Sequence, residues 1–387
     1  MKTKSHETLI HEYLYEDNLK DRTHLLELGY RAQLMPGEEI HKVYLELTDR
    51  CNLNCAICYR KSWDEAQFNL DMSEETLNRV ETDLKEVKGI KKLVLGGIGE
   101  PLYHPQILKV LERFSHYPLH ITSNGTMMTA TMVEALVGRV QEITISVDGV
   151  GKAFEAIRGI GVDVVASGIQ RLQQRKKELD TAWPRISLQF VASRQNIDQI
   201  YAVLDLAHEL GCGKLILSHL IPQTEENKHQ YLYGFAGLTS HETQLLFHKI
   251  RMYSHRKTVT VQFPQAVLKT ERACAFIEDV TTYITAGGDV VPCYRFSHPY
   301  EEYVFGRKKQ VTKHSFGNIN ESSLLSIWNS VPYQRFRYQI HCNFYPSCMD
   351  CDLVEGCEYA TETREDCYGV QPTCADCLWA RRFVMCP

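Results

Sequence analysis

The chain has 387 residues, of which 44% are hydrophobic and 10% aromatic, enough for a packed core and for two domains. Its formal net charge of -5 at pH 7 gives no sign of a nucleic-acid partner. No run of about 18 apolar residues could span a membrane, and the first ten residues lack the apolar segment of a secretion signal, so we expect a cytoplasmic protein.

Fourteen cysteines are the most unusual feature of the composition. In a chain without a secretion signal, so many cysteines favour metal binding or catalysis over disulfides. Three of them lie between Cys51 and Cys58, and ten lie between Cys274 and Cys386. Cys212 is isolated, and we expect it to be buried and inert. The distribution predicts one small metal site near the N-terminus and a metal-rich module behind it.

Residues 1–40 are polar and mixed, and we expect an N-terminal extension with a helix at 11–28 that covers the following domain or contacts a partner. From residue 41 to 222, apolar segments alternate with stretches of helical spacing. The predicted strands are 43–48, 92–96, 119–123, 143–147, 186–192 and 214–220, and the predicted helices begin at Ser73 and cover 107–114 and 196–211. This alternation indicates parallel βαβ units, in either a partial barrel or a doubly wound sheet.

Two further regions follow. Residues 223–273 form a charged connection, which we interpret as a bridge between domains, with a helix at 240–253 and a strand at 258–263. Residues 274–387 hold most of the cysteines and a predicted hairpin, with strands at 281–285 and 290–294 around a Gly-Gly turn.

The first metal motif directly follows the first predicted strand. Its cysteines, Cys51, Cys55 and Cys58, have the spacing Cys-x3-Cys-x2-Cys. Iron–sulfur clusters normally have four Cys ligands, so three leave one iron open for a ligand that is not protein. The alternative is a zinc site completed by a distant His, but zinc sites favour a second pair of ligands, and none lies nearby.

Polar residues collect at the C-terminal ends of the predicted strands, where α/β barrels place their function. In the stretch 96–101, Gly-Gly-Ile-Gly-Glu-Pro, the glycines allow close backbone approach and the carboxylate can accept from an ammonium group. The candidate cofactor-binding residues are Gly97, Gly99, Glu100, Ser123, Asn124, Ser146, Asp148, Arg158 and Gln189. His219, which ends the sixth strand, could face a substrate. The plainer interpretations are Gly-rich turns, turn dipeptides and a buried structural His.

The C-terminal cysteines also follow a pattern. Cys274 is followed by Gly-x4-Cys and later by Cys-x2-Cys-x5-Cys. The candidate metal ligands of this region are Cys274, Cys293, Cys348, Cys351, Cys357, Cys367, Cys374 and Cys377. As an alternative, the pairs Cys348-x2-Cys351 and Cys374-x2-Cys377 approximate a zinc ribbon.

These motifs resemble the radical S-adenosylmethionine (SAM) superfamily with its SPASM extension. The resemblance implies an α/β fold, with a partial (β/α)6 TIM-like barrel at 41–222 and a C-terminal cysteine-rich SPASM/twitch iron–sulfur domain at 274–387. In the superfamily, the open iron of a [4Fe-4S] cluster is chelated by the amino and carboxylate groups of SAM. One electron then cleaves the carbon–sulfur bond, and the resulting 5′-deoxyadenosyl radical takes a hydrogen atom from the substrate.

The SPASM resemblance implies two auxiliary [4Fe-4S] clusters. By family order, one cluster would use Cys274, Cys293 and Cys367. The other would use Cys348, Cys351, Cys357 and one of Cys374 or Cys377. The chain departs from the family at Thr361, where another Cys is usual. Cys342 and Cys386 are then spare or complete an open site.

Three stretches narrow the resemblance, namely 45–55, 96–101 and 372–381 with the terminal Cys-Pro. They are similar to the radical SAM maturases associated with tungsten-containing aldehyde:ferredoxin-type oxidoreductases. The resemblance implies a low-potential electron donor, such as ferredoxin or flavodoxin, and action on a tungsten oxidoreductase or its cofactor. The alternatives are a SPASM enzyme that modifies a peptide and a non-catalytic iron–sulfur electron carrier. The residues do not specify the substrate.

Overall fold

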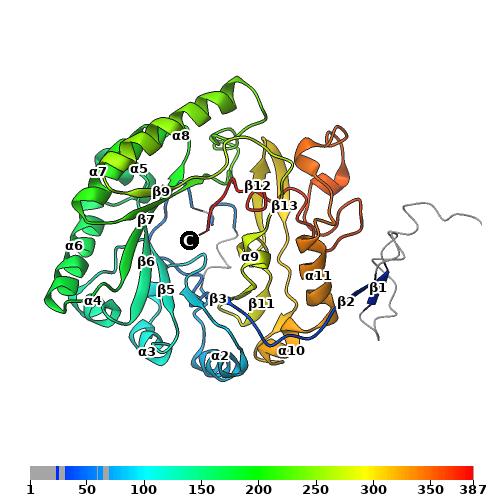
Figure 1. Cartoon of the computed structure of the whole chain (residues 1–387), viewed down its shortest axis with the longest axis horizontal. Coiled ribbons are helices and arrows are strands. Elements are labelled where there is room, and N and C mark those ends of the chain that lie inside the picture. The colour runs from blue at the N-terminus through cyan, green and yellow to red at the C-terminus, as the bar shows by residue number, and fades with distance from the viewer. Residues whose placement is uncertain (1–22, 26–30, 59, 64–68, 387) are drawn as a thin grey trace, which may run out of the picture.

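The computed structural model describes residues 23–25, 31–58, 60–63 and 69–386. Within these residues the centre of the molecule is a ten-stranded sheet in the order β14-β11-β10-β3-β4-β5-β6-β7-β8-β9. The sheet curves around the middle of the molecule, with helices along its outer side (Figure 1).

The six strands predicted for the barrel are all confirmed. They are β3 (Lys42–Leu45), β4 (Lys92–Leu95), β5 (Leu119–Ser123), β6 (Val140–Ser146), β7 (Arg185–Ala192) and β8 (Lys214–His219). Each is parallel to the next strand along the chain. A doubly wound sheet would reverse its strand order at a switch point. The unbroken order therefore selects the partial barrel.

Helices cover the outer side of these strands. They are α2 (Glu74–Glu86), α3 (Ile107–Arg113), α4 (Ala130–Leu136), α5 (Gly151–Arg158), α6 (Val162–Glu178), α7 (Ile200–Glu209) and α8 (Leu238–Arg256). The start of α2 is the predicted one, because the Ser73 hydroxyl accepts from the backbone N–H of Thr76 at 3.1 Å. Its Leu77, Val80 and Leu84 are buried against the sheet, as their spacing predicts.

Strands from outside the predicted barrel extend both edges of the sheet. β9 (Thr260–Gln262) is parallel to β8, and β10 (Thr281–Ile284) is parallel to β3. The predicted hairpin is confirmed, because β10 pairs antiparallel with β11 (Asp289–Val291). β14 (Gly317–Asn318) pairs with β11 at the sheet edge. The cysteine-rich region therefore begins with strands that continue the barrel sheet, while the boundaries at 222 and 273 remain predictions.

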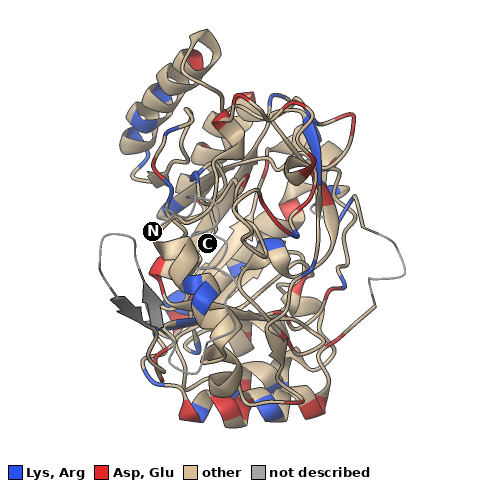
Figure 2. Ribbon diagram, turned by 90° about the vertical axis from the view of Figure 1, so that its right-hand side faces the viewer, with Lys and Arg blue, Asp and Glu red and all other residues tan. Residues whose placement is uncertain are grey.

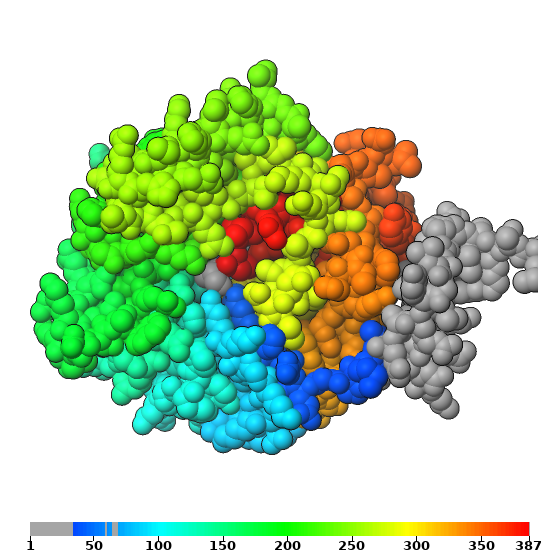
Figure 3. Space-filling model, viewed as in Figure 1, coloured from blue at the N-terminus to red at the C-terminus, as the bar shows by residue number. Residues whose placement is uncertain are grey.

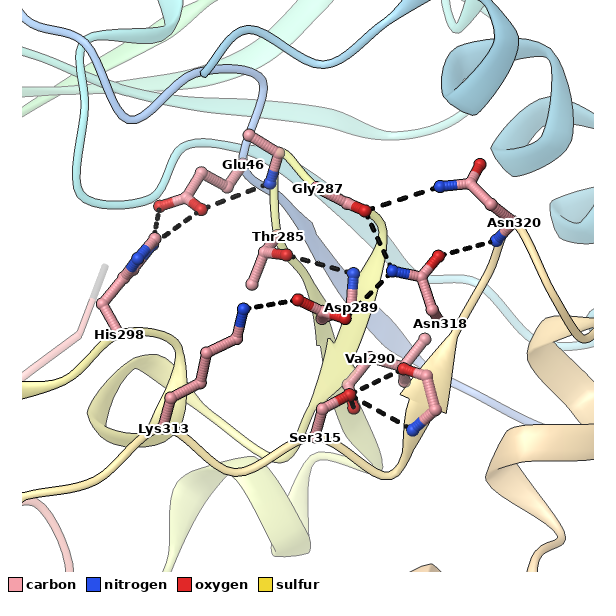
Figure 4. Close-up of polar contacts among 12 residues, drawn as sticks. Glu46, Thr285, Gly287, Asp289, Val290, His298, Lys313, Ser315, Asn318 and Asn320 are labelled. Atoms are coloured by element: carbon pink, nitrogen blue, oxygen red, sulfur yellow. Dashed lines mark hydrogen bonds and ion pairs between the residues drawn. The ribbon is translucent and has the colours of Figure 1, made fainter. Parts of the chain in front are cut away.

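Side-chain contacts fix the hairpin turn (Figure 4). The Asn318 amide donates to the Gly287 carbonyl at 3.0 Å and to the Asp289 carboxylate at 2.9 Å. Asp289 also pairs with Lys313. Gly288 has φ 86°, a left-handed conformation that favours glycine, and an added Cβ there would lie 2.5 Å from the Asn320 side chain.

The rest of the C-terminal region packs beside this hairpin. Its elements are β12 (Tyr300–Val304), β13 (Arg307–Val311), α9 (Ala275–Glu278), α10 (Leu324–Trp328) and α11 (Val331–His341), with 3-10 turns at Tyr294–Phe296, Cys348–Asp350 and Glu358–Ala360. None of the helices in the described ranges is both long and apolar enough to cross a bilayer. Acidic and basic residues are interspersed along the ribbon in this view (Figure 2).

The N-terminal helix prediction is wrong where it can be compared with the structure. Most of the range 11–28 lies outside the described residues, but Thr23–Leu25 form a strand, β1, that pairs antiparallel with β2 (Arg31–Gln33). The following residues reach the C-terminal region, since the Asn329 side chain exchanges hydrogen bonds of 2.8 and 2.9 Å with the Gly37 backbone.

Candidate active site and cysteine groups

A cavity of about 280 Å³ lies at the C-terminal ends of the barrel strands. Its lining brings together residues that the sequence singled out from distant positions. These are Cys51, Cys55, Cys58, Gly97, Gly99, Glu100, Ser123, Asn124, Ser146, Arg158, Gln189 and His219. Of the predicted cofactor-binding residues, Asp148 alone is absent from the lining.

N–H groups of the protein point at each thiol of the front motif. The backbone N–H of Leu53 donates to Cys51 Sγ at 3.5 Å, and that of Arg60 donates to Cys58 Sγ at 3.4 Å. The Arg158 guanidinium lies 3.7 Å from Cys55 Sγ. Burial raises the pKa of Cys51 to about 11, and the N–H donors oppose this shift. Such donors stabilise thiolates, the form that binds iron, so the loop suits a cluster.

The glycine-rich loop packs directly on the cysteine loop. A Cβ added at Gly99 would lie 2.2 Å from the Thr48 carbonyl and 2.5 Å from the Arg50 carbonyl. Backbone cannot yield as a flexible side chain can, so only glycine fits here. The Arg50 carbonyl also accepts from the Glu100 N–H at 2.8 Å. Gly99 therefore sets Glu100 beside the three cysteines.

The Glu100 carboxylate is buried and held by three donors. It accepts from the Ser123 hydroxyl at 2.8 Å, from the Asn124 N–H at 2.6 Å and from the Leu102 N–H at 3.1 Å. Burial nevertheless raises the pKa of Glu100 to about 7, because these donors only partly offset desolvation. A bound cation would favour the ionised form. The site thus has the chemistry to receive an ammonium group.

Asp148 acts on the cavity through another residue. It is fully buried and accepts from Arg158 Nε at 2.7 Å and from the Val191 N–H at 2.8 Å. Asp148 and Cys55 raise the pKa of Arg158 although burial opposes them. Arg158 is therefore a permanent cation at the cavity wall, oriented by Asp148 toward Cys55.

Glu46 and His298 form a contact beside the glycine-rich loop that the sequence did not single out. The buried Glu46 carboxylate accepts from His298 Nε2 at 2.9 Å (Figure 4). It also accepts from Tyr283 OH at 2.9 Å and from the Ile98 N–H at 3.2 Å. His298, with the N–H of Ile98 and the Tyr283 hydroxyl, keeps the pKa of Glu46 low despite its burial. Glu46 thus joins the glycine-rich loop to the C-terminal region. No local spacing could have revealed a partner 252 residues away.

The C-terminal tail closes one side of the cavity, which the sequence also did not predict. Val384, Met385 and Cys386 line the cavity, and the C-terminal residues are visible at the centre of the face in Figure 3. The Met385 N–H donates to the Ser218 hydroxyl at 3.0 Å, and the Gln189 amide donates to the Met385 carbonyl at 3.5 Å. The tail is therefore held across the ends of β7 and β8.

His219 combines a structural role with a place in the cavity wall. Its Nε2 lies 2.9 Å from the Gln265 carbonyl, which only an Nε2–H can satisfy. Burial lowers the pKa of His219 to about 4, so the ring is neutral. Nδ1 is then a buried acceptor, with no hydrogen-bond partner among the described residues. Cys212 is buried and apart from the other cysteines, as expected, and its burial raises its pKa to about 12.

A second, small cavity has four cysteines in its lining, namely Cys274, Cys293, Cys374 and Cys377. Burial raises the pKa of all four thiols. Family order implied that Cys367 joins Cys274 and Cys293, whereas the cavity lining contains Cys374 and Cys377 in its place. The two pairs of the zinc-ribbon alternative also separate, since Cys348 and Cys351 are not in this lining.

Cys367 lies near Cys348, Cys351 and Cys357 instead of near the Cys274 group. Burial raises the pKa of Cys367, and Asp366, Cys357 and Cys351 raise it further. The charge of Cys367 in turn raises the pKa of Cys348, so these two thiols also lie near each other. Within the described ranges, no three His, Cys, Asp or Glu side chains converge closely enough to hold a single metal ion. A cubane is larger, and each thiolate binds a different iron, so four thiols around a cavity remain a suitable ligand set.

Tyr294 and Trp379 line both cavities. They form the wall between the front cysteines and the Cys274 group. Cys386 lies at the same wall, where burial raises its pKa to about 11 and the Trp379 side chain hydrogen-bonds it. The two cavities thus share these two aromatic side chains in their linings.

Comparisons with known proteins agree with this arrangement. Residues 45–232 match the Radical SAM superfamily, and residues 274–352 match SPASM, an iron-sulfur cluster-binding domain. The chain is 36% identical, over 351 residues, to the tungsten-containing aldehyde ferredoxin oxidoreductase cofactor-modifying protein of Pyrococcus furiosus. That match covers 89% of this chain and 96% of the relative.

Solved structures show the same fold. Streptococcus suis SuiB bound to its precursor peptide SuiA matches with a TM-score of 0.62 and 16% identity, over 89% of this chain and 77% of SuiB. Native anSMEcpe with bound AdoMet matches with a TM-score of 0.55 and 13% identity, over 88% of this chain and 95% of that one. The chain is an enzyme of the radical SAM superfamily with a SPASM domain, and it belongs to the same family as the cofactor-modifying protein of Pyrococcus furiosus.

Proposed function

We propose that this enzyme binds SAM in the 280 Å³ cavity and cleaves it reductively. The observation that carries the proposal is the meeting of three thiols, a buried carboxylate and strand-end polar groups in one cavity. When bound, a [4Fe-4S] cluster with one open iron would supply the electron that cleaves SAM to a 5′-deoxyadenosyl radical. Cys51, Cys55 and Cys58 would hold that cluster.

The residues of the cavity then have separate roles. Glu100 accepts a hydrogen bond from the amino group of SAM, and Gly97 and Gly99 line the cavity beside it. Ser123 and Asn124 lie beside Glu100, where they can contact the ribose as well as orient the carboxylate. Ser146 and Gln189 are neighbours on β6 and β7 and form the opposite wall.

Arg158 places a fixed positive charge next to Cys55, with Asp148 as its positioning partner. A cation beside a thiolate favours the more negatively charged state of that site. We therefore assign Arg158 to stabilising the reduced form of the front site. The electron would come from a low-potential donor such as ferredoxin or flavodoxin.

For the two auxiliary [4Fe-4S] clusters we propose the ligand sets that the structure brings together. One set is Cys274, Cys293, Cys374 and Cys377, and the other is Cys348, Cys351, Cys357 and Cys367. Each set has the four thiolates that a cubane requires. The first set lies behind Tyr294 and Trp379, close to the cavity in which the radical would form.

The substrate that the family supports best is a tungsten oxidoreductase or its cofactor, because the match with the Pyrococcus furiosus cofactor-modifying protein covers 89% of this chain and 96% of that protein. The second candidate is a peptide, since SuiB of the same fold binds a precursor peptide. In this chain, however, the tail residues Val384–Cys386 occupy one wall of the cavity. We take that wall to favour a small group, such as the cofactor, over a peptide segment.

The two candidates can be separated with the reduced enzyme and SAM. Isolated tungsten cofactor, the tungsten oxidoreductase lacking a finished cofactor, and a short peptide are each added in turn. We expect the cofactor or its protein to raise the rate of 5′-deoxyadenosine formation. When that substrate is deuterated at non-exchangeable positions, deuterium should appear in the 5′-deoxyadenosine. Stimulation by the peptide alone would move the assignment to peptide modification.

A further inference from the structure

One face of α8 carries a regular exposed pattern that the cavity does not use. Leu238, Leu245 and Met252 recur every seven residues, and 84%, 49% and 50% of their surfaces are exposed. His241, His248 and His255 recur with the same period, three residues after each of them, and are also exposed. Positions i, i+3 and i+7 lie along one line of a helix. We call these six residues the α8 seam.

The opposite face of α8 already holds the helix in place. Thr243, Phe247, Ile250 and Ser254 are buried against the barrel. Phe247 packs on Phe263 and on His219, with ring centroids 5.3 and 5.9 Å apart. The helix therefore needs nothing from the seam to stay folded. Exposed apolar residues are ordinary when scattered, but a heptad repeat over a whole helix is not scattered.

The geometry of the seam fits another helix better than a lipid surface. A helix that lies in a membrane presents a broad apolar face. The seam is one residue wide, with imidazoles between the aliphatic side chains, which is the layout of a and d positions in a two-helix interface.

The flanks of the seam carry a charge that selects the partner. Lys249 and Arg256 lie on one side and Arg251 on the other, against the single acidic residue Glu242. The chain as a whole is acidic, at -5, so this basic stripe is local. Charges beside a and d positions decide which helix pairs with which. A second copy of this chain would bring the same basic flanks against each other.

We propose that the α8 seam docks an α-helix of a protein partner, whose apolar stripe fits the seam and whose flanking residues are acidic. The proposal stands apart from the reaction that the cavity performs. Because Phe247 of the same helix touches His219 at the cavity wall, a partner held here would sit directly behind the active site.

A designed peptide tests the seam directly. The probe is a labelled three-heptad helix with Leu at its a and d positions and Glu at the flanking positions, and its counterpart has Lys in place of Glu. We expect the full-length protein to bind the Glu peptide at least about tenfold more tightly than the Lys peptide by fluorescence anisotropy. Equal binding, or no binding of the Glu peptide, overturns the proposal.

Matched variants test whether the peptide binds at the α8 seam. Leu245→Glu with Met252→Glu should abolish it, while Leu108→Glu, at a helix position of similar exposure on α3, should leave it unchanged. Circular dichroism and 5′-deoxyadenosine formation should be unaltered in both. Loss of binding in the Leu108 variant would show nonspecific attraction and contradict the proposal. A wild-type dimer in sedimentation equilibrium that the seam variants convert to monomer would instead assign the seam to a second copy.

Discussion

Two opposing effects act on the protonation of the Glu100 carboxylate. Its burial favours the neutral acid, while the three donors around it and an incoming ammonium group favour the ion. The sequence could predict Glu100, Ser123 and Asn124, because parallel strands bring their C-terminal ends to one edge. It could not predict Glu46, whose partners come from β10 and from the loop at His298.

Replacing Glu100 by Gln should weaken SAM binding by about 1–3 kcal/mol, because the buried acceptor for the amino group of SAM loses its charge. Equilibrium dialysis with labelled SAM measures the change. Gln189→Asn, at the opposite wall of the cavity, serves as the comparison and should have the smaller effect. An unchanged affinity in the Glu100 variant would leave that residue a purely structural role.

The raised pKa of Glu100 also predicts a pH dependence. The pKa of Glu100 is about 7 in the folded protein and 4.5 in the unfolded chain. Between these pH values the folded apoprotein therefore holds a proton that the unfolded chain has lost. The contribution of this group to the free energy of unfolding is therefore full below pH 4.5 and is lost as the pH rises to 7. SAM needs the ionised form, so its affinity should rise between pH 6 and pH 8. In Glu100→Gln both dependences should be flattened, and a wild-type affinity that falls over this range would contradict the assignment.

At the scale of elements, two loops at the strand ends work as one unit. The cysteine loop after β3 and the glycine-rich loop after β4 meet at Gly99, where no side chain fits. The motif predicted that glycine is needed here because it lets the backbone approach a ligand closely. The structure shows that the close approach is between two stretches of the chain's own backbone.

Gly99→Ala should therefore displace the cysteine loop and lower both SAM affinity and iron content at the front site. Gly161→Ala is the matched control, because a Cβ at that position meets no atom within 4 Å. Iron analysis and SAM binding on the two variants make the comparison. If Gly99→Ala binds SAM as the wild type does, the two loops are not coupled in this way.

Over the whole molecule, the barrel and the C-terminal region share a sheet and an aromatic wall. Secondary structure could be predicted well, because periodicity is local and the six barrel strands each carry it. The pairing of β10 with β3 and the grouping of Cys374 and Cys377 with Cys274 could not be predicted, because they depend on contacts across a hundred residues or more. The ligand set that family order implies, with Cys367 beside Cys274 and Cys293, differs from the lining of this cavity for the same reason.

Iron counts on anaerobically reconstituted variants test the grouping. The wild type should approach three cubanes, or about twelve iron atoms per chain. Cys293→Ala and Cys374→Ala together should lose no more iron than either alone, because both belong to one site. Cys348→Ala combined with Cys374→Ala should lose about twice as much, and Cys212→Ala should lose none. Additive losses from Cys293→Ala and Cys374→Ala would contradict the grouping.

Cleavage of SAM in the front cavity can be tested by following its product, 5′-deoxyadenosine. Reconstituted, reduced protein is mixed with SAM, and 5′-deoxyadenosine is measured by mass spectrometry. The wild type should form it, and Cys55→Ala should form none while retaining the iron of the two rear sites. Formation of 5′-deoxyadenosine at the wild-type rate by Cys55→Ala, or none by a wild type with its full iron content, would contradict the account.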